Sequence, residues 1–198
     1  MGHKDGEWLA GSFLISDVNL VDPNFNRTVI LLIDHDDDGA FGVVINRRLD
    51  ATLSLVIPEF ADTAAGSITL YEGGPVQSDY LFAIHSGLPD SVRSEHAIEP
   101  IEHVTFEPAF QVLADHLKNE WEVRSRHDLP PVHLYVGYSG WGGGQLESEL
   151  REGAWIVRPA SAKYIFTEDP DEGWRGALGE LGGIHKIVAD TGYKPSMN

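Results

Sequence analysis

The strongest hint of covalent chemistry in this sequence is the run Gly-Tyr-Ser-Gly around Ser139. A serine between small residues, after a strand and before a helix, resembles the G-x-S-x-G nucleophile of hydrolases. The final position of that motif requires glycine, yet bulky Trp141 stands there. His185 with Asp169 or Asp190 could complete a triad on paper, but nine histidines make such a pairing easy to find by chance. The sequence therefore favours a protein without enzymatic activity, with a Ser139 hydrolase as an alternative.

The glycines of Gly137–Gly144 suggest a second alternative, phosphate or nucleotide binding. Backbone N–H groups at a helix N-terminus attract anions. However, neither G-K-[ST] nor G-x-G-x-x-G occurs in register. Glu147 and Glu149 would lie in the first helical turn, where they satisfy the helix dipole and repel an anion. The competing interpretation is that the glycines let Trp141 and the chain pack tightly.

Metal binding has weaker support. The run Asp34–Gly39 matches the opening D-x-D-x-D-G of a calcium loop, but the twelfth position, which needs a bidentate acid, is Ile45. His35, and His96 with His103, lack an H-x-x-x-H spacing, and we expect them to be exposed to solvent. We therefore expect the acidic run to be a solvated hairpin tip, and we predict no metal and no cofactor.

Composition limits the possible partners and the location of the protein. The chain has 198 residues, a net charge of −17 and no cysteine, so disulfides and thiolate sites are excluded. Neither a basic tail nor a run of Lys or Arg is present, which disfavours direct binding to nucleic acid. No apolar run is long enough to span a membrane. We expect a soluble, cytoplasmic, single-domain protein over residues 1–198 that binds a protein or a small molecule.

The stretch Val132–Trp155 is expected to organise the fold as a strand, a glycine loop and a short helix. Strands outnumber helices, and short turns join most of them, which favours an α+β class with antiparallel pairing. Phe110, Leu113, Leu117 and Trp121 form one apolar stripe of a helix that begins at Pro108. The expected strands are 11–16, 28–33, 41–45, 67–71, 80–85, 101–106, 132–136 and 184–189, and the other expected helices are 145–152 and the segment from 169 to about 181.

Four motifs in this order resemble the YqgE/AlgH family of bacterial proteins. They are Gly11–Ile15 with Asp22–Val29, Asp34–Arg47, Gly73–Gln77, and Gly137–Glu147 with Ala154 and Trp155. The resemblance implies one α+β domain whose largely antiparallel sheet bifurcates into a pseudo-barrel with flanking helices. It also implies a regulatory role, described in the family as transcriptional regulation. Two positions depart from the family pattern: Ser139 replaces the usual alanine, which weakens a catalytic role, and Arg48 replaces the usual proline.

We expect three segments to converge on one binding surface: Ser139–Gln145, Gly73–Gln77 and Asp22–Arg27. Glycine loops let a partner approach closely, and loops on a rigid scaffold often carry function. Trp141 would supply apolar area, and Arg27, Asn46 and Gln145 would supply hydrogen bonds. In the alternative, structural interpretation, Trp141 is part of the core and Arg27 pairs with Asp22 or another acid. The predicted site residues are Asp22, Arg27, Asn46, Gly73, Gly74, Gln77, Trp141 and Gln145.

Overall fold

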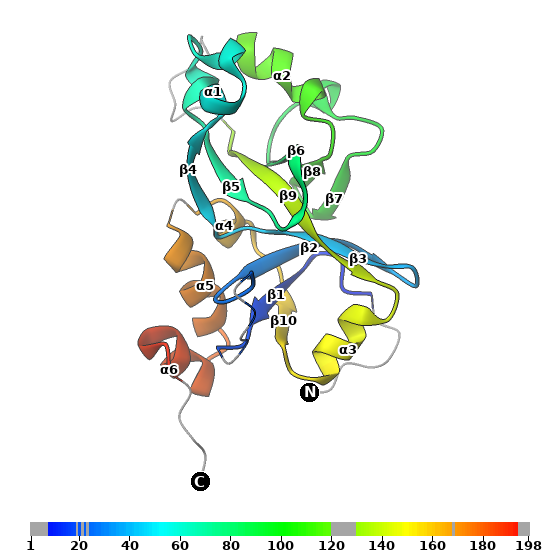
Figure 1. Cartoon of the computed structure of the whole chain (residues 1–198), viewed down its shortest axis with the longest axis vertical. Helices are drawn as coiled ribbons and strands as arrows, with labels where there is room; N and C mark the ends of the chain where they lie inside the picture. The colour runs from blue at the N-terminus through cyan, green and yellow to red at the C-terminus, as the bar shows by residue number, and fades with distance from the viewer. Residues whose placement is uncertain are drawn as a thin grey trace.

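One curled sheet forms the framework of the protein (Figure 1). The computed structural model describes residues 8–18, 20, 22, 24–119, 130–167 and 169–193. Its strands are β1 (Ser12–Ser16), β2 (Val29–Asp36), β3 (Gly39–Val44), β4 (Arg48–Thr52), β5 (Thr69–Glu72), β6 (Val76–His85), β7 (Ile98–Ile101), β8 (Val104–Glu107), β9 (Val132–Gly142) and β10 (Trp155–Pro159). Its α-helices are α1 (Leu53–Val56), α2 (Phe110–Asn119), α3 (Gln145–Arg151), α4 (Ala162–Ile165), α5 (Pro170–Gly179) and α6 (Gly183–Thr191).

Strand β9 crosses from the upper part of the molecule toward α3 and belongs to both of its halves (Figure 1). The upper half contains β4–β8, α1 and α2, and the lower half contains β1–β3, β10 and α3–α6. The strand order is β10-β1-β2-β3-β9-β6-β8-β7, and β5 pairs in parallel with β9 and antiparallel with β4. The other pairs are antiparallel. The expected α+β fold, a bifurcated sheet curled into a half-barrel with flanking helices, is therefore confirmed.

Strand β2 shows how the sequence produces this sheet. All residues from Val29 to Ile33 are buried, as predicted for an apolar run covered on both faces. Val29, Leu31 and Ile33 face the barrel interior together with Phe13 and Tyr135. Alternate residues of the same strand, such as Ile30, pack on the other face against α3. Strand β2 continues to Asp36 and forms the predicted hairpin with β3.

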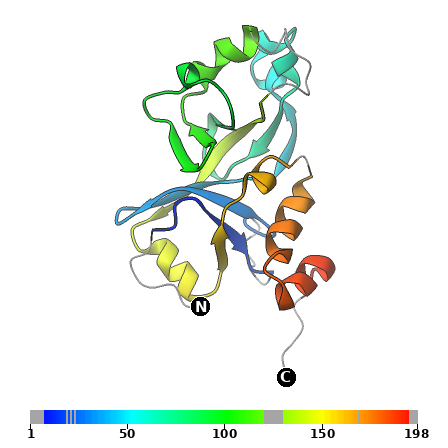
Figure 2. The ribbon, with the colours of Figure 1, turned by 180° about the vertical axis from the view of Figure 1, so that it is seen from behind.

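The C-terminal helices flank the lower half beside β1 and β10, as seen from behind in Figure 2. Helix α5 begins as predicted: Asp169 accepts a hydrogen bond from the Asp171 N–H (3.0 Å), and Pro170 is the first helical residue. Glu172 does not complete a capping box, because the Asp169 N–H donates to the Thr167 hydroxyl (3.3 Å) and not to the Glu172 carboxylate.

The predicted strand 184–189 is wrong, because this segment belongs to helix α6. Ile184 and Val188 lie four residues apart on the packed side, whereas Ile187 is exposed. An apolar run of this length fits both a helix and a strand, so periodicity alone could not separate them. In α2, Phe110, Leu113 and Leu117 form the predicted buried stripe, and Trp121 lies outside the described residues.

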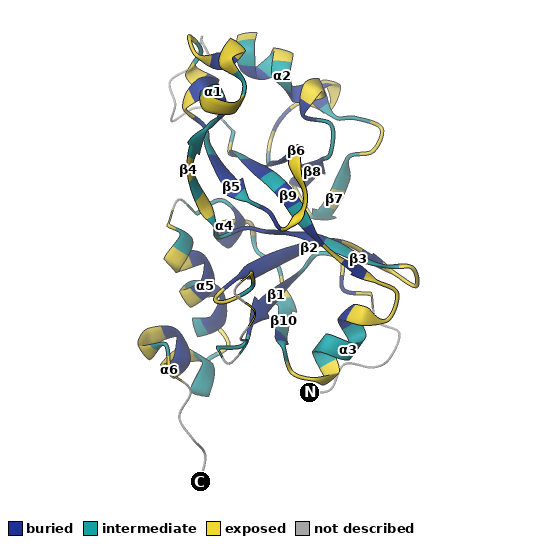
Figure 3. Cartoon of the chain, in the orientation of Figure 1, coloured by how far each residue is buried: buried dark blue, intermediate teal, exposed yellow. Residues whose placement is uncertain are grey.

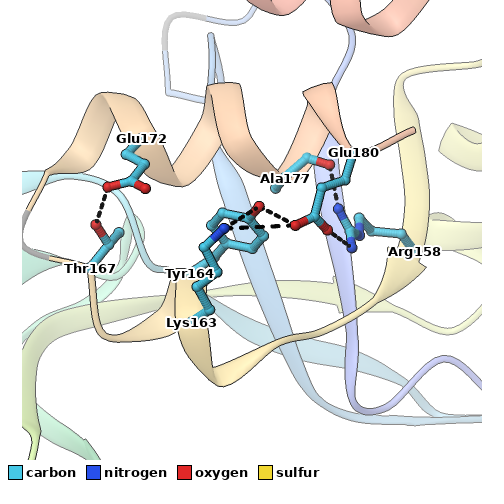
Figure 4. A network of polar contacts seen from close by, with 7 residues as sticks. All are labelled: Arg158, Lys163, Tyr164, Thr167, Glu172, Ala177 and Glu180. Atoms are coloured by element: carbon cyan, nitrogen blue, oxygen red, sulfur yellow. Dashed lines mark hydrogen bonds and ion pairs between the residues drawn. The ribbon is translucent and has the colours of Figure 1, made fainter. Parts of the chain in front are cut away.

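A polar network connects α4 and α5 to β10 (Figure 4). Arg158 donates to the Ala177 carbonyl oxygen and to the Glu180 carboxylate, both at 2.6 Å. The Tyr164 hydroxyl also donates to Glu180. Gly176 allows this contact, because a Cβ at that position would lie 2.4 Å from the Tyr164 ring. The network fixes the helices on the sheet and satisfies its own polar groups.

Candidate functional site

The sheet divides at Gly137 and Tyr138 of β9. Before this point one edge of β9 pairs with β5, and after it Ser139–Gly142 pair with Gly39–Gly42 of β3. The predicted glycine loop 139–145 is therefore wrong for most of its length, since β9 continues to Gly142. The short turn at Gly143 and Gly144 precedes α3. The glycines suggested a loop because glycine is uncommon inside strands, and the sequence does not reveal that they pair with β3.

The turn at Gly73 and Gly74 packs directly against this division. The Gly73 N–H donates to the Val136 carbonyl oxygen, and the Gly73 carbonyl oxygen accepts from the Val44 N–H, both at 2.8 Å. Gly74 has φ +150°, and a Cβ there would lie 2.3 Å from the Tyr138 backbone. The two glycines are therefore required by the close approach of two chain segments. The structure thus brings two of the three predicted segments together.

Ser139 is buried within this contact. Its side chain is 1% exposed, and its hydroxyl donates to the Gly73 carbonyl oxygen at 3.4 Å. Within the described residues no histidine is hydrogen-bonded to Ser139, so the nucleophile lacks a base. This geometry gives no support to the hydrolase alternative.

We expect Ser139→Ala to change the free energy of unfolding by less than about 1 kcal/mol and to leave any cellular function intact. The lost hydrogen bond is long, and the Gly73 carbonyl oxygen keeps the Val44 N–H. Denaturant unfolding of both proteins measures the change. A fluorophosphonate probe that labels the wild-type protein at Ser139, but not the variant, would contradict this prediction and restore the hydrolase alternative.

Trp141 lies in the core, as the structural interpretation expected. It is 7% exposed and packs edge-on against Trp155, with 6.2 Å between ring centroids. Both indole N–H groups donate to the same Glu149 oxygen, at 2.8 Å from Trp141 and 2.7 Å from Trp155. Trp141 therefore offers no apolar contact area to a partner, and Glu149 holds two tryptophans in place.

Side chains of the protein itself surround the start of α3 and form hydrogen bonds there. Gln145 accepts from the Gly142 N–H (3.2 Å) and donates to Glu149 (3.0 Å). Glu147 in the first turn is hydrogen-bonded to His35 at 2.7 Å. With acidic groups around it and Gly142 already engaged, this end of α3 does not favour a phosphate.

His35 was predicted to be exposed, and this is wrong: its side chain is 3% exposed. Strand β2 continues past Ile33, and its register against β3 shifts between Leu32 and Asp34. After this irregularity His35 is buried toward α3, whereas Asp34 and Asp36 remain exposed. The His35 Nδ1 accepts from the Leu9 N–H at 3.1 Å. Asp36 accepts from the N–H groups of residues 38 and 39, so its carboxylate closes the hairpin turn. His96 and His103 are exposed, as predicted.

The predicted residues Arg27 and Asn46 lie together beneath the C-terminal helices. Asn46 accepts from the Val29 N–H (2.8 Å) and donates to the Arg27 carbonyl oxygen (2.9 Å). The Arg27 guanidinium lies 5.6 Å from the Trp174 ring centroid. Asp22 accepts from the Asn24 N–H (2.8 Å). Asn46 thus joins the start of β2 to the turn before it, which is a structural role.

Gln77 lies in an exposed segment, Pro75–Tyr80, next to the point where the sheet divides. We name this segment the β6 arm. Val76 pairs with Tyr138 and Leu81 with Val136, so five positions of β6 span only two of β9. The extra residues bulge outward, and Gln77 has φ +51°, a backbone conformation that non-glycine residues rarely adopt. Figure 3 shows this exposed start of β6 in front of β9.

The exposed ring of Tyr80 extends an aromatic cluster at the base of the β6 arm. Tyr80 is 58% exposed and stacks on Phe82 with 6.2 Å between centroids. Phe82 contacts Phe106 and Tyr138, and Tyr138 contacts Phe41. We did not predict Tyr80 or Tyr138 as site residues. The spacing of Tyr80 and Phe82, which places both on one face of a strand, was the available signal.

A second aromatic group lies on the barrel side of β9. His133 stacks on Tyr71 with 4.8 Å between centroids and meets Phe166 edge-on. Burial lowers the pKa of His133 from 6.5 to about 4. Burial, and then the neighbouring Tyr71, raise the pKa of Tyr135 well above its usual value. Both groups are therefore uncharged at neutral pH.

None of the helices in the described residues is both long enough and apolar enough to cross a membrane. The described helices instead cover the sheet.

Comparison with known proteins identifies related chains. A family model described as AlgH-like matches residues 13–186. UPF0301 protein Tgr7_2910 of Thioalkalivibrio sulfidiphilus is 34% identical over 91% of this chain and 94% of its own length. A UPF0301 protein of Chlorobium limicola is 34% identical over 95% of both chains.

Two solved structures share the fold. The AlgH protein from Pseudomonas aeruginosa, solved in solution, matches with a TM-score of 0.72 and 30% identity over 100% of both chains. Protein DIP2367 of Corynebacterium diphtheriae matches with a TM-score of 0.72 over 96% of this chain and 94% of its own, and its 22% identity supports similarity of fold alone.

Proposed function

The chain belongs to the AlgH-like family, and we propose that it is a non-catalytic binding module whose contact surface is the β6 arm. This proposal rests on one observation: one edge of the strand in the β6 arm has no neighbouring strand among the described residues. β6 pairs with β8 only from Ala83 onward, and among the described residues no strand pairs with that edge from 76 to 82. Val76 and Tyr80 are exposed beside it.

We propose that the occupant is an extended, basic segment of a protein partner. An unpaired strand edge can accept a further strand through main-chain hydrogen bonds. Tyr80 offers a large, rigid ring of the kind enriched in interfaces. The net charge of −17, with Asp79 in the arm itself, favours a basic segment and opposes pairing with a second copy of this acidic chain.

A regulatory role, which the family resemblance implies, would then act through this partner and not through DNA. The chain has 31 acidic and 14 basic residues, and it lacks the basic run that phosphate contacts require. We further propose that this contact takes place in the cytoplasm. The buried Ser139 and the self-occupied start of α3 make catalysis and nucleotide binding less well supported.

The test compares strains that carry variants of the chromosomal gene. The double variant Val76→Ser with Tyr80→Ala should reproduce the transcript changes of a deletion strain while the protein stays at its normal level. Leu55→Ser is the matched control, because Leu55 is also exposed, on α1 in the upper half, and should behave as wild type. Photo-cross-linking from position 80 should join the protein to a basic, extended segment of one partner.

Two results would contradict the proposal. One is full function of the double variant in a strain where deletion changes transcripts. The other is tight, sequence-selective DNA binding by the purified protein in a gel shift at physiological salt.

A further inference from the structure

A buried polar group lies in the upper half, between the sheet and α2. His85 on β6 is paired with Thr105 on β8, so that both side chains lie on the sheet face toward α2. Arg93 and Glu107 complete what we name the His85 cluster. This cluster is separate from the β6 arm, and the proposed function does not use it.

Several polar atoms of the His85 cluster have no hydrogen-bond partner within the described residues. They are both ring nitrogens of His85, the Thr105 Oγ1 and the Arg93 Nε. His85 is 0% and Thr105 is 1% exposed, so bulk water does not reach them. The Arg93 Nε lies 3.4 Å from an Asp90 oxygen, but without hydrogen-bond geometry.

Glu107, the nearby acid, is already engaged elsewhere. Its carboxylate accepts from the Ser94 N–H (2.7 Å), the Ser94 hydroxyl (2.5 Å) and the Ala109 N–H (2.9 Å). It therefore joins the segment at Ser94 to the start of α2 and gives no hydrogen bond to His85. Arg93 in turn forms an ion pair with Glu99 at 3.3 Å.

The environment of His85 also determines its charge state. Burial lowers the pKa of His85 to about 4, and the Arg93 guanidinium adds to this effect. Glu107 acts in the opposite direction, and His116 on α2 lowers the pKa further. His85 is therefore neutral at pH 7, with one donor and one acceptor nitrogen.

Polar atoms buried without a partner are rare in native proteins and usually indicate an internal water or ion. The free atoms here supply one donor from the Arg93 Nε, a donor and an acceptor from Thr105, and a donor and an acceptor from His85. Donors and a nearby arginine exclude a cation, and the Glu107 carboxylate opposes an anion. The remaining candidate is an uncharged ligand that can both donate and accept hydrogen bonds.

We propose that the His85 cluster is a buried hydration site that holds an ordered water bridging His85 and Thr105, with Arg93 Nε as a further donor. Internal waters form about three hydrogen bonds to buried polar groups, which the cluster supplies. The water completes the polar layer beneath α2 and contributes to holding the helix on the sheet.

The first test is Thr105→Val, which keeps the shape of the side chain and removes the hydroxyl. If water bridges the hydroxyl, the variant should melt about 2–4 °C lower, the shift expected for loss of one hydrogen bond in a domain of this size. Thr28→Val is the matched control, because the Thr28 hydroxyl donates to the Phe25 carbonyl oxygen (2.9 Å), and its loss should lower the melting temperature by a similar amount. An unchanged or higher melting temperature for Thr105→Val, beside a loss in Thr28→Val, would overturn the proposal.

The second test detects the water itself in the wild-type protein, so it holds even if a variant does not fold. A high-resolution crystal structure should show a water within hydrogen-bond distance of both the His85 ring and the Thr105 Oγ1. An empty space between these groups, or a rotated His85 bonded to protein atoms, would overturn the proposal.

Discussion

Trp141→Ala should lower the free energy of unfolding by about 3–5 kcal/mol, the usual cost of removing a large buried aromatic side chain. Trp141 is 7% exposed and packs against Trp155, so the variant leaves a cavity next to α3. It also removes one of the two indole donors to Glu149. Urea unfolding followed by far-UV circular dichroism measures the change.

Tyr80→Ala is the matched control for this prediction. Tyr80 is also aromatic and lies on the same sheet, but it is 58% exposed, so its loss should change stability by less than about 0.5 kcal/mol. Equal, small effects of the two substitutions would show that Trp141 is not a core residue and would return it to the list of contact residues.

The free energy of unfolding should also fall as pH decreases from 6.5 toward 4. His85 and His133 each have a pKa lowered from 6.5 to about 4 by burial. The unfolded chain therefore takes up protons below pH 6.5, whereas the folded protein resists them until about pH 4. For the fully buried His85 this difference corresponds to roughly 3 kcal/mol, and the partly exposed His133 should contribute less.

Denaturant unfolding at intervals across this range measures the effect. Carboxylates affect the free energy of unfolding at lower pH. The Tyr164 hydroxyl and Arg158 lower the pKa of Glu180 from 4.5, so the stability that Glu180 contributes is lost only below pH 4.5. His133→Phe should preserve the ring stack with Tyr71 and reduce the slope between pH 6.5 and 4.5. A flat stability profile across that window in the wild-type protein would contradict the prediction.

Elements with strong local signals could be predicted from the sequence. The uninterrupted apolar run of β2, the turn after it and the Asp169–Pro170 start of α5 each depend on residues close in sequence, and all three are confirmed. The segment 184–189 was too short for its period to distinguish a helix from a strand. The family motifs supplied the bifurcated sheet, which local patterns alone do not specify.

The candidate site depends on contacts between distant segments, and sequence patterns do not contain them. The glycines of β9 suggested a loop because glycine weakens strands, and their pairing with β3 could not be seen from so distant a segment. A tryptophan between glycines is compatible with both an exposed and a buried position. The contacts of Trp141 with Glu149 and Trp155 bury it in this fold. The exposure of Tyr80 comes from a register shift against β9, which no residue type in the arm indicates.

The shared strand β9 also has a consequence for how the protein folds. Gly39 of β3 pairs with Gly142 of β9, and the whole upper half lies between these residues in the chain. Closing so long a loop in an unfolded chain carries a large entropic cost, which slows pairing between distant segments. Prior formation of the upper half would shorten that search, because it places the first part of β9 beside β5 and β6 and so delivers the second part to β3. We therefore expect substitutions that destabilise the upper half to slow the pairing of β3 with β9, although they lie outside the lower sheet.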